Sequence, residues 1–210
     1  MTKLRREYTD AGLNEQDLDA NPFNQFDQWF QEAIDAKIDL PDAMTLATAT
    51  QDGIPSARIV LLRGHDERGF VFYTDYESQK GKELAENPKA ALVFYWRELD
   101  RQVRITGQVS KVSRENSQHY FQSRPIGSRL AALASKQSEV IPDRRVLEDR
   151  FNQLAAQYQD EEIPLPADWG GYRLSPDMIE FWSGRPSRLH DRLRYTRQPN
   201  NDWRIERISP

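Results

Sequence analysis

Near its C-terminal end the chain gathers a tryptophan, a histidine and three arginines within eleven residues: Trp182, Arg185, Arg188, His190 and Arg192. Arginine pairs with phosphate or carboxylate in a fixed geometry and stacks on rings, while histidine donates, accepts or transfers a proton near neutral pH. Such a cluster suits a flat, anionic, aromatic ligand. A solvated surface strand carries the same pattern, and for the cluster taken alone that interpretation is favoured by about two to one.

Other cations that could hold a phosphate lie earlier in the chain. Arg58 and Arg63 border a predicted strand. Alternation places them on opposite faces of that strand, so they would contact different partners. Ser78-Gln79-Lys80, at a predicted helix start, combines a hydroxyl, backbone donors and a cation. Tyr120 and Arg124 lie four residues apart on another predicted helix. An ordinary surface charge or helix cap would look the same in each case.

Several other chemistries are excluded. The chain has no cysteine, which rules out disulfides, thiolate catalysis and Cys-type zinc sites. Its three histidines lack metal-type spacing, so we expect no metal site. There is no glycine-rich phosphate loop and no Gly-x-Ser-x-Gly motif, so any phosphate must be held by side chains.

The net charge of −4 is unevenly distributed. From Arg185 to Arg207 seven arginines face three acidic residues, a local excess of +4 that leaves −8 on the rest of the chain by subtraction. A local basic site on an acidic protein favours a small anionic ligand over a nucleic acid.

Length and composition predict one folded domain over residues 1–210, because no Gly/Ser-rich or Pro-rich linker interrupts the chain. No run approaches the roughly 18 apolar residues of a membrane span, and the N-terminal residues contain no apolar signal segment. Together with the lack of cysteine, this leads us to expect a cytoplasmic protein.

The elements that must position these residues can be read from periodicity and capping. Helices are predicted from Asn21-Pro22 onward and over 78–87, 114–123, 130–134 and 144–159. Strands are predicted over 44–50, 55–63, 70–74, 90–96, 102–109, 171–174, 178–182, 189–197 and 203–208, with a turn region over 64–69. Consecutive strands without intervening helices favour an antiparallel barrel with peripheral helices and disfavour a Rossmann fold.

Taken in order, these motifs resemble the pyridoxine (pyridoxamine) 5′-phosphate oxidases, flavoproteins of the FMN-binding split-barrel class. The resemblance covers nearly the whole chain. It includes Leu4 to Tyr8, Arg58 to Leu62, Phe72 to Thr74, Arg101 to Val103, Tyr120-Phe121 with Ser123 to Pro125, Ser135 to Ser138, Pro164 to Pro166 with Trp169 to Gly171, Glu180 to Trp182, Arg188 to Arg192 and Trp203 to Pro210. It implies an α+β fold built on a mainly antiparallel split β-barrel with peripheral helices, and a homodimer that binds FMN in two clefts at the subunit interface.

The resemblance also implies roles for individual residues. FMN contacts are expected at Arg58, Ile59, Val60, Leu61, Leu62, Arg63, Tyr73, Thr74, Gln79, Lys80, Gln102, Gln137, Ser138, Trp182 and Arg192. Substrate contacts are expected at Arg5, Tyr8, Arg63, Tyr120, Arg124, Ser128, Arg188 and His190, with residues 1–20 a flexible segment that contributes to this site. Arg188 and His190, the catalytic candidates, would face one side of a strand and position the substrate over the flavin. Because Pro125 ends the preceding helix, Ser128 is expected in the following turn.

The implied reaction oxidises C4′ of pyridoxamine or pyridoxine 5′-phosphate to give pyridoxal 5′-phosphate, a step of vitamin B6 biosynthesis and salvage, while O2 becomes H2O2. Two positions depart from the family pattern, which usually has Lys at Arg63 and Arg at Gln79. The second change removes a cation from the phosphate site, so FMN affinity is expected to fall unless another group compensates.

Three alternatives remain open. One is a split-barrel flavoprotein with another substrate, and a second is a non-catalytic carrier of FMN or pyridoxal phosphate. The third is an anion- or RNA-binding barrel, which the overall acidity disfavours.

Overall fold

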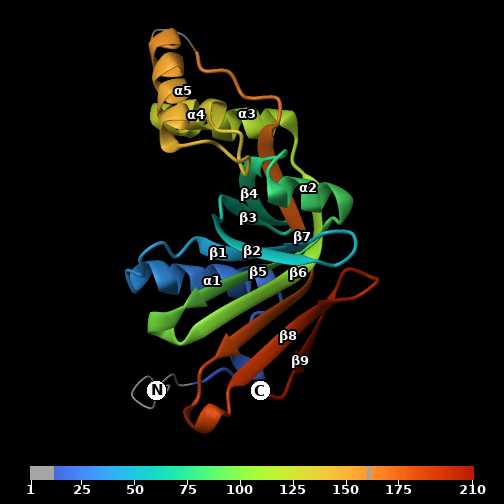
Figure 1. The fold of residues 1–210 in the computed structure, drawn as a ribbon. Helices are drawn as coiled ribbons and strands as arrows, with labels where there is room; N and C mark the ends of the chain where they lie inside the picture. Colours follow the sequence, from blue (N-terminus) through green and yellow to red (C-terminus); the bar gives the residue numbers. More distant parts are fainter. Residues whose placement is uncertain (1–11, 160–161) are drawn as a thin grey trace.

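The computed structural model describes residues 12–159 and 162–210, in which helices pack against one curled sheet (Figure 1). Within these residues the sheet runs in the order β2-β1-β5-β6-β7-β4-β3, β8 pairs with β7 and β9 with β8, and every pairing is antiparallel. The strands are β1 (Ala43–Ala49), β2 (Pro55–Leu61), β3 (Gly64–Asp66), β4 (Gly69–Asp75), β5 (Lys89–Trp96), β6 (Arg101–Lys111), β7 (Trp169–Ser183), β8 (Asp191–Arg197) and β9 (Trp203–Arg207). The predicted antiparallel α+β architecture is confirmed.

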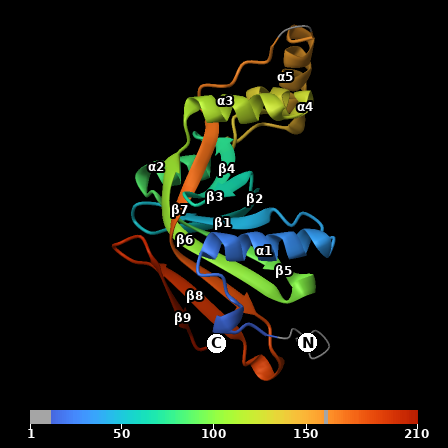
Figure 2. The same cartoon turned by 180° about the vertical axis from the view of Figure 1, so that it is seen from behind.

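The helices are α1 (Pro22–Asp35), α2 (Gln79–Glu86), α3 (Arg114–Ser123), α4 (Ile126–Ala134) and α5 (Arg144–Gln157). α1 begins as predicted, with the Asn21 side chain accepting a hydrogen bond from the backbone N–H of Phe23. It lies across the curled sheet (Figure 2), where Phe26 packs edge-on against Phe70 and Trp29 against Phe181. These contacts close the main core of the barrel.

The barrel is incomplete between β2 and β4, which are not paired as strands. The backbone N–H of Arg63, just beyond β2, donates to the carbonyl oxygen of Val71 on β4 at 2.8 Å. This bond adjoins the β3–β4 pairing just beyond the end of β2, and residues from β2 and β4 line a cavity beside it. The split in the barrel therefore makes room for a ligand.

Helices α3, α4 and α5 form a separate layer at one end of the sheet (Figure 1). Their own small core contains Phe121, Leu130, Ile163 and Trp169, the last contributed by the start of β7. This layer places the end of α3 and the residues after α4 over β4. In the described part of the chain, no helix is long and apolar enough to cross a membrane.

Two of the predicted strands, 171–174 and 178–182, are wrong as separate elements because β7 is one continuous strand. The register of β6 against β7 shifts at Gly107, which stands opposite Pro176. A bulge accommodates a proline that cannot donate to the ladder, and it bends the strand without ending it.

Three other predicted boundaries need correction. The turn region 64–69 contains a short strand, β3, paired with β4. The helix predicted over 130–134 begins earlier, at Ile126, so Ser128 lies in the first turn of α4 and the prediction of a turn was wrong. The strand predicted over 189–197 begins only at Asp191, because Leu189 caps the short 3-10 turn Pro186–Arg188 with φ −85° and ψ 56°, outside the extended region of a strand.

Candidate functional site

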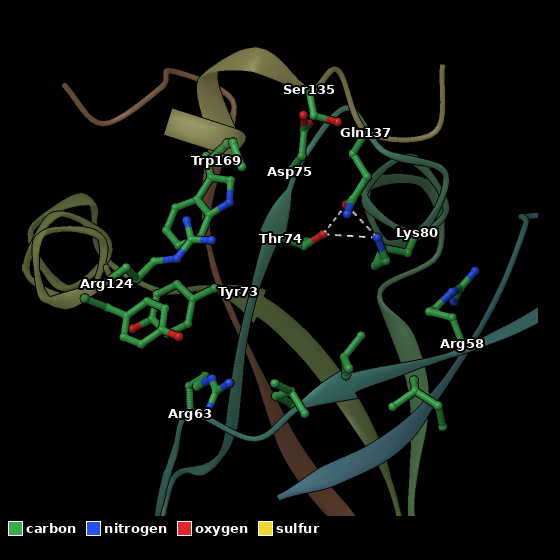
Figure 3. Close-up of a pocket in the computed structure, with 16 residues that line it drawn as sticks. Arg58, Arg63, Tyr73, Thr74, Asp75, Lys80, Arg124, Ser135, Gln137 and Trp169 are labelled. Carbon is green, nitrogen blue, oxygen red and sulfur yellow. Dashed lines mark hydrogen bonds between the residues drawn. The ribbon is translucent and has the colours of Figure 1, made fainter. Parts of the chain in front are cut away.

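A cavity of about 490 Å³ lies in the split of the barrel, beneath α4 (Figure 3). Cations, hydroxyl groups and aromatic rings from elements far apart in the sequence meet in it. Its lining residues are Arg58, Ile59, Val60, Leu61, Arg63, Tyr73, Thr74, Asp75, Lys80, Tyr120, Arg124, Ala131, Ala132, Ser135, Gln137 and Trp169.

Lys80, in the first turn of α2, supplies a buried cation at one side of the cavity. Its ammonium group donates to Gln137 Oε1 at 2.7 Å and to Thr74 Oγ1 at 3.1 Å (Figure 3). Burial, followed by the nearby positive charge of Arg58, lowers the pKa of Lys80 to about 8. No carboxylate forms an ion pair with this ammonium among the described residues, and an incoming anion would offset its cost of burial.

Arg58 lies near Lys80, and four hydrogen-bond acceptors hold its guanidinium in place. Its guanidinium contacts Glu83 Oε2 at 3.3 Å and the carbonyl oxygen of Leu46 at 3.4 Å, and it also bonds the hydroxyl groups of Thr48 and Ser56. Two cations therefore converge on one part of the cavity, in surroundings that suit a phosphate.

The other side of the cavity is aromatic. Tyr73 stacks on Tyr120 with ring centroids 3.9 Å apart and on Trp169 at 5.5 Å. The guanidinium of Arg124 lies 4.7 Å from the Trp169 ring centroid. Its Nη1 is buried without a hydrogen-bond partner, and burial lowers the pKa of the side chain. An unsatisfied charged donor above a stack of rings marks a second position for an anion.

Arg63 also lines this cavity, and its guanidinium pairs with Asp42 at 2.9 Å. β2 ends at Leu61, so strand alternation does not extend to Arg63, and the predicted separation of Arg58 and Arg63 onto opposite faces does not keep them out of one cavity. They do meet different carboxylates, as predicted.

A second group of predicted residues forms a row across neighbouring strands. Gln102 on β6 pairs with Trp182 on β7, and Trp182 pairs with Arg192 on β8. Arg192 donates two hydrogen bonds to Glu180, at 2.8 and 3.1 Å, which raise the pKa of Arg192. Glu180 is only 2% exposed and also accepts from Arg104, so its carboxylate fixes Arg192 in place.

The two catalytic candidates lie beside this row but not on a strand, so their predicted placement on one strand face was wrong. Arg188 is exposed at the end of a short 3-10 turn, and His190 precedes β8. The His190 ring lies 4.7 Å from the Trp182 ring, and its Nδ1 accepts a hydrogen bond from the backbone N–H of Arg185 at 3.0 Å. Burial and then the charge of Arg188 lower the pKa of His190, which favours the neutral ring.

These two groups of residues are far apart within one chain. Trp169 in the cavity and Trp182 in the second group lie near opposite ends of β7, a separation of up to about 43 Å along an extended strand. Figure 1 shows the helical layer at one end of the sheet and the β8–β9 hairpin at the other. A single chain therefore brings together only part of the predicted site.

Several predicted residues lie elsewhere. Leu62 is buried in the main core, Gln79 turns toward Glu83, and Ser138 follows Gln137 in an exposed loop with a φ angle of 74°. Arg5 and Tyr8 fall outside the described residues. The beginning of the described chain nevertheless lies near His190, because the backbone N–H of Leu13 donates to Asp191 at 3.0 Å.

Five residues of the cavity were not assigned a role from the sequence: Asp75, Ala131, Ala132, Ser135 and Trp169. Ser135 and Trp169 belonged to the sequence motifs that carried the family resemblance, so the sequence contained a signal that could have assigned them to the site. The two alanines offered no chemical signal, since small side chains matter here only for the space they leave. In the described ranges, no cluster of three or more His, Asp or Glu side chains is arranged to hold a metal.

A curled antiparallel sheet that is split at a cation- and ring-lined cavity defines a split-barrel protein with a site for a phosphorylated ligand. The chain belongs to the pyridoxamine 5′-phosphate oxidase family. Residues 30–158 match the family model described as pyridoxamine 5′-phosphate oxidase, and residues 169–210 match its pyridoxine 5′-phosphate oxidase C-terminal dimerisation region.

Similar proteins agree with this assignment. The chain is 59% identical to a pyridoxine/pyridoxamine 5′-phosphate oxidase of Paraburkholderia phymatum, covering 100% of this chain and 99% of the relative. It is 58% identical to the protein of that name from Nostoc sp. (strain PCC 7120), covering 99% and 97%. Among solved structures, PhzG from Burkholderia lata 383, in complex with tetrahydrophenazine-1-carboxylic acid, is 34% identical with a TM-score of 0.90, covering 96% of this chain and 99% of that one.

Proposed function

We propose that this protein is an FMN-dependent oxidase that converts pyridoxamine 5′-phosphate and pyridoxine 5′-phosphate to pyridoxal 5′-phosphate in the cytoplasm, with O2 reduced to H2O2. The names of its relatives support this substrate class. The observation that carries the proposal is a cavity with two separate cationic positions, one at Lys80 and Arg58 and the other at Arg124. A phosphorylated cofactor and a phosphorylated substrate require two such positions.

The residues present fit FMN. The cations Lys80 and Arg58 would hold its phosphate, because the buried ammonium of Lys80 gains most from an anion. Gln102, Trp182 and Arg192 would meet the ring system from the second group. When bound, FMN supplies the two-electron acceptor for oxidation at C4′ and is reoxidised by O2.

The remaining residues would bind and orient the substrate. Arg124 presents its unsatisfied donor to the substrate phosphate, beside Tyr120 and Arg63. Ser128, in the first turn of α4, would add a hydroxyl to the same phosphate. His190 and Arg188 would align the pyridoxyl ring, with His190 held by the backbone of Arg185.

We further propose that the working form is a homodimer, with each complete site shared between two subunits. The physical support is the distance between the cavity and the Trp182–His190 group, which one chain leaves far apart. The dimerisation region matched by residues 169–210 includes that second group. Each subunit would then supply the cavity of one site and the second group of the other.

The deciding experiment uses the purified protein. Bound flavin is detected by its absorption, and pyridoxamine or pyridoxine 5′-phosphate is then added with oxygen while aldehyde formation is followed. We expect a yellow protein that turns over both substrates. A colourless protein that FMN cannot reconstitute would contradict the flavin assignment. A flavoprotein inert toward both substrates, or one that oxidises only a tricyclic acid such as the PhzG ligand, would contradict the substrate assignment.

A further inference from the structure

Glu83 is a buried carboxylate that none of the proposed roles uses. It lies on α2, in contact with Ser56 and Arg58 of β2, and is 5% exposed. Its Oε2 accepts hydrogen bonds from Ser56 at 2.6 Å and from Thr48 and Arg58, while Oε1 accepts from Gln79 at 2.9 Å. Burial alone would raise its pKa, but the hydrogen bonds and then the charge of Arg58 lower the pKa of Glu83 to about 2.

A permanent negative charge next to the cations that receive a phosphate has two opposing effects. Its Coulomb repulsion weakens binding of another anion. Its hydrogen bond to Arg58 fixes a long, flexible side chain before the ligand arrives, which removes an entropic cost of binding. Whether removal of the Glu83 charge weakens or strengthens binding of the phosphate therefore distinguishes a positioning role from a purely structural one.

The geometry favours positioning. Both terminal nitrogens of Arg58 have acceptors, since Nη2 bonds Ser56 and Glu83 while Nη1 bonds Thr48 and the carbonyl oxygen of Leu46. Ser56 and Thr48 in turn donate to Glu83. The three acceptor side chains therefore form one connected network, in which Glu83 is the only charged acceptor.

Gln79 takes part in the same network. Its amide donates to Oε1 of Glu83 and leaves Oε2 to Arg58. An arginine at position 79 would be a second cation four residues before Glu83 on the same helix face, able to compete with Arg58 for this carboxylate. The glutamine therefore keeps Glu83 as the partner of Arg58.

We propose that Glu83 is a positioning residue that orients Arg58 toward the ligand phosphate, and that Gln79 supports it through the second carboxylate oxygen. The inference rests on the proposed function for the identity of the ligand, FMN. It predicts that the pair sets the preference of the protein for FMN over riboflavin, which lacks the phosphate.

The test measures the dissociation constants of FMN and riboflavin by flavin fluorescence for the apoprotein and its variants. Glu83→Gln keeps the side-chain shape and removes the charge, and we expect FMN affinity to fall by about tenfold while riboflavin affinity changes by less than about twofold. Gln79→Ala, at an exposed position, should give a smaller loss of the same selectivity. Glu77→Gln, which removes an exposed carboxylate near the start of α2, is the matched control and should leave both constants unchanged.

Unchanged or tighter FMN binding in Glu83→Gln would overturn the proposal, because repulsion or a purely structural role would then dominate. Equal losses for FMN and riboflavin would overturn it in the same way. If Glu83→Gln does not fold, as judged by thermal unfolding, an unchanged FMN-to-riboflavin ratio in Gln79→Ala is the contradicting result. Failure of the wild-type protein to bind FMN would instead contradict the proposed function.

Discussion

Lys80, which is buried, and Arg124, which is half-buried, are cations whose charges the folded chain leaves poorly compensated. Lys80 is 8% exposed and bonds only neutral oxygen atoms, and Arg124 has an unsatisfied Nη1. Burying such groups costs free energy that folding alone does not return. Because both residues lie in one cavity, bound anions would offset this free-energy cost. A specific prediction follows for each residue.

The first prediction concerns pH and Lys80. Its pKa falls from the usual 10.5 to about 8. Between these values the unfolded chain keeps a proton that the folded apoprotein has lost, so the free energy of unfolding should rise with pH in this window. A phosphate favours the protonated form, so FMN affinity should fall as pH rises through about 8, approaching about tenfold per pH unit.

Fluorescence titration of the apoprotein with FMN between pH 7 and 9.5 measures this effect. Lys80→Met removes the titrating group and should give weaker binding with a flatter pH dependence. Wild-type affinity that stays constant over the range would show that Lys80 keeps its proton throughout.

A second prediction separates the substrate phosphate from the cofactor. Arg124→Ala removes the unsatisfied donor, so KM for pyridoxamine 5′-phosphate should rise by about 10- to 100-fold, since a charged hydrogen bond contributes about 1.5–3 kcal/mol. Flavin content should stay near the wild-type value. Steady-state kinetics and flavin absorbance measure the two quantities.

Arg145→Ala, at an exposed position on α5, is the control and should change neither KM nor flavin content. Loss of flavin from Arg124→Ala in step with the rise in KM would place Arg124 in the cofactor site instead.

At the scale of elements, the bend of β7 is the feature on which the site most depends. Opposite the bulge, Gly107 approaches Ser175 and Pro176 so closely that a Cβ atom would collide with the Ser175 carbonyl oxygen. The side chain is excluded by backbone atoms, which cannot move aside as a flexible side chain can. The glycine therefore permits one strand to run from the cavity to Trp182.

Gly107→Ala should accordingly lower the free energy of unfolding by about 2–3 kcal/mol, as overpacking at a buried position does. Chemical denaturation measures the loss. Gly127→Ala is a matched control, because nothing lies within 4 Å of the added carbon and alanine favours the α4 helix. Equal stability of the two variants would show that the bulge adjusts freely.

At the scale of the whole molecule, the cavity and the Trp182–His190 group lie at opposite ends of one folded subunit. If each site is shared between two subunits, variants damaged in different halves should complement each other. Lys80→Ala and Trp182→Ala should each bind FMN poorly alone. Mixed dimers would contain one site with both changes and one intact site, so refolding a 1:1 mixture should restore about a quarter of the sites.

FMN binding and oxidase activity of the refolded mixture measure this recovery. A mixture that contains heterodimers but recovers no binding would show that each site is built within one chain. Refolding either variant alone is the control and should recover nothing.

The sequence by itself determined most of the elements and the family. Caps at Asn21 and Ser78 and alternation along β6 act between close neighbours, so they can be recognised without the fold. The ordered motifs likewise predicted cavity residues such as Arg58, Lys80 and Arg124. Tertiary structure decided the features that depend on distant partners: the bulge at Gly107 opposite Pro176, the pairing of Arg58 with Glu83, and the hydrogen bond from Lys80 to Gln137. Which groups meet is set by cross-strand register and shared burial, and these arise only when segments far apart in the sequence pack together.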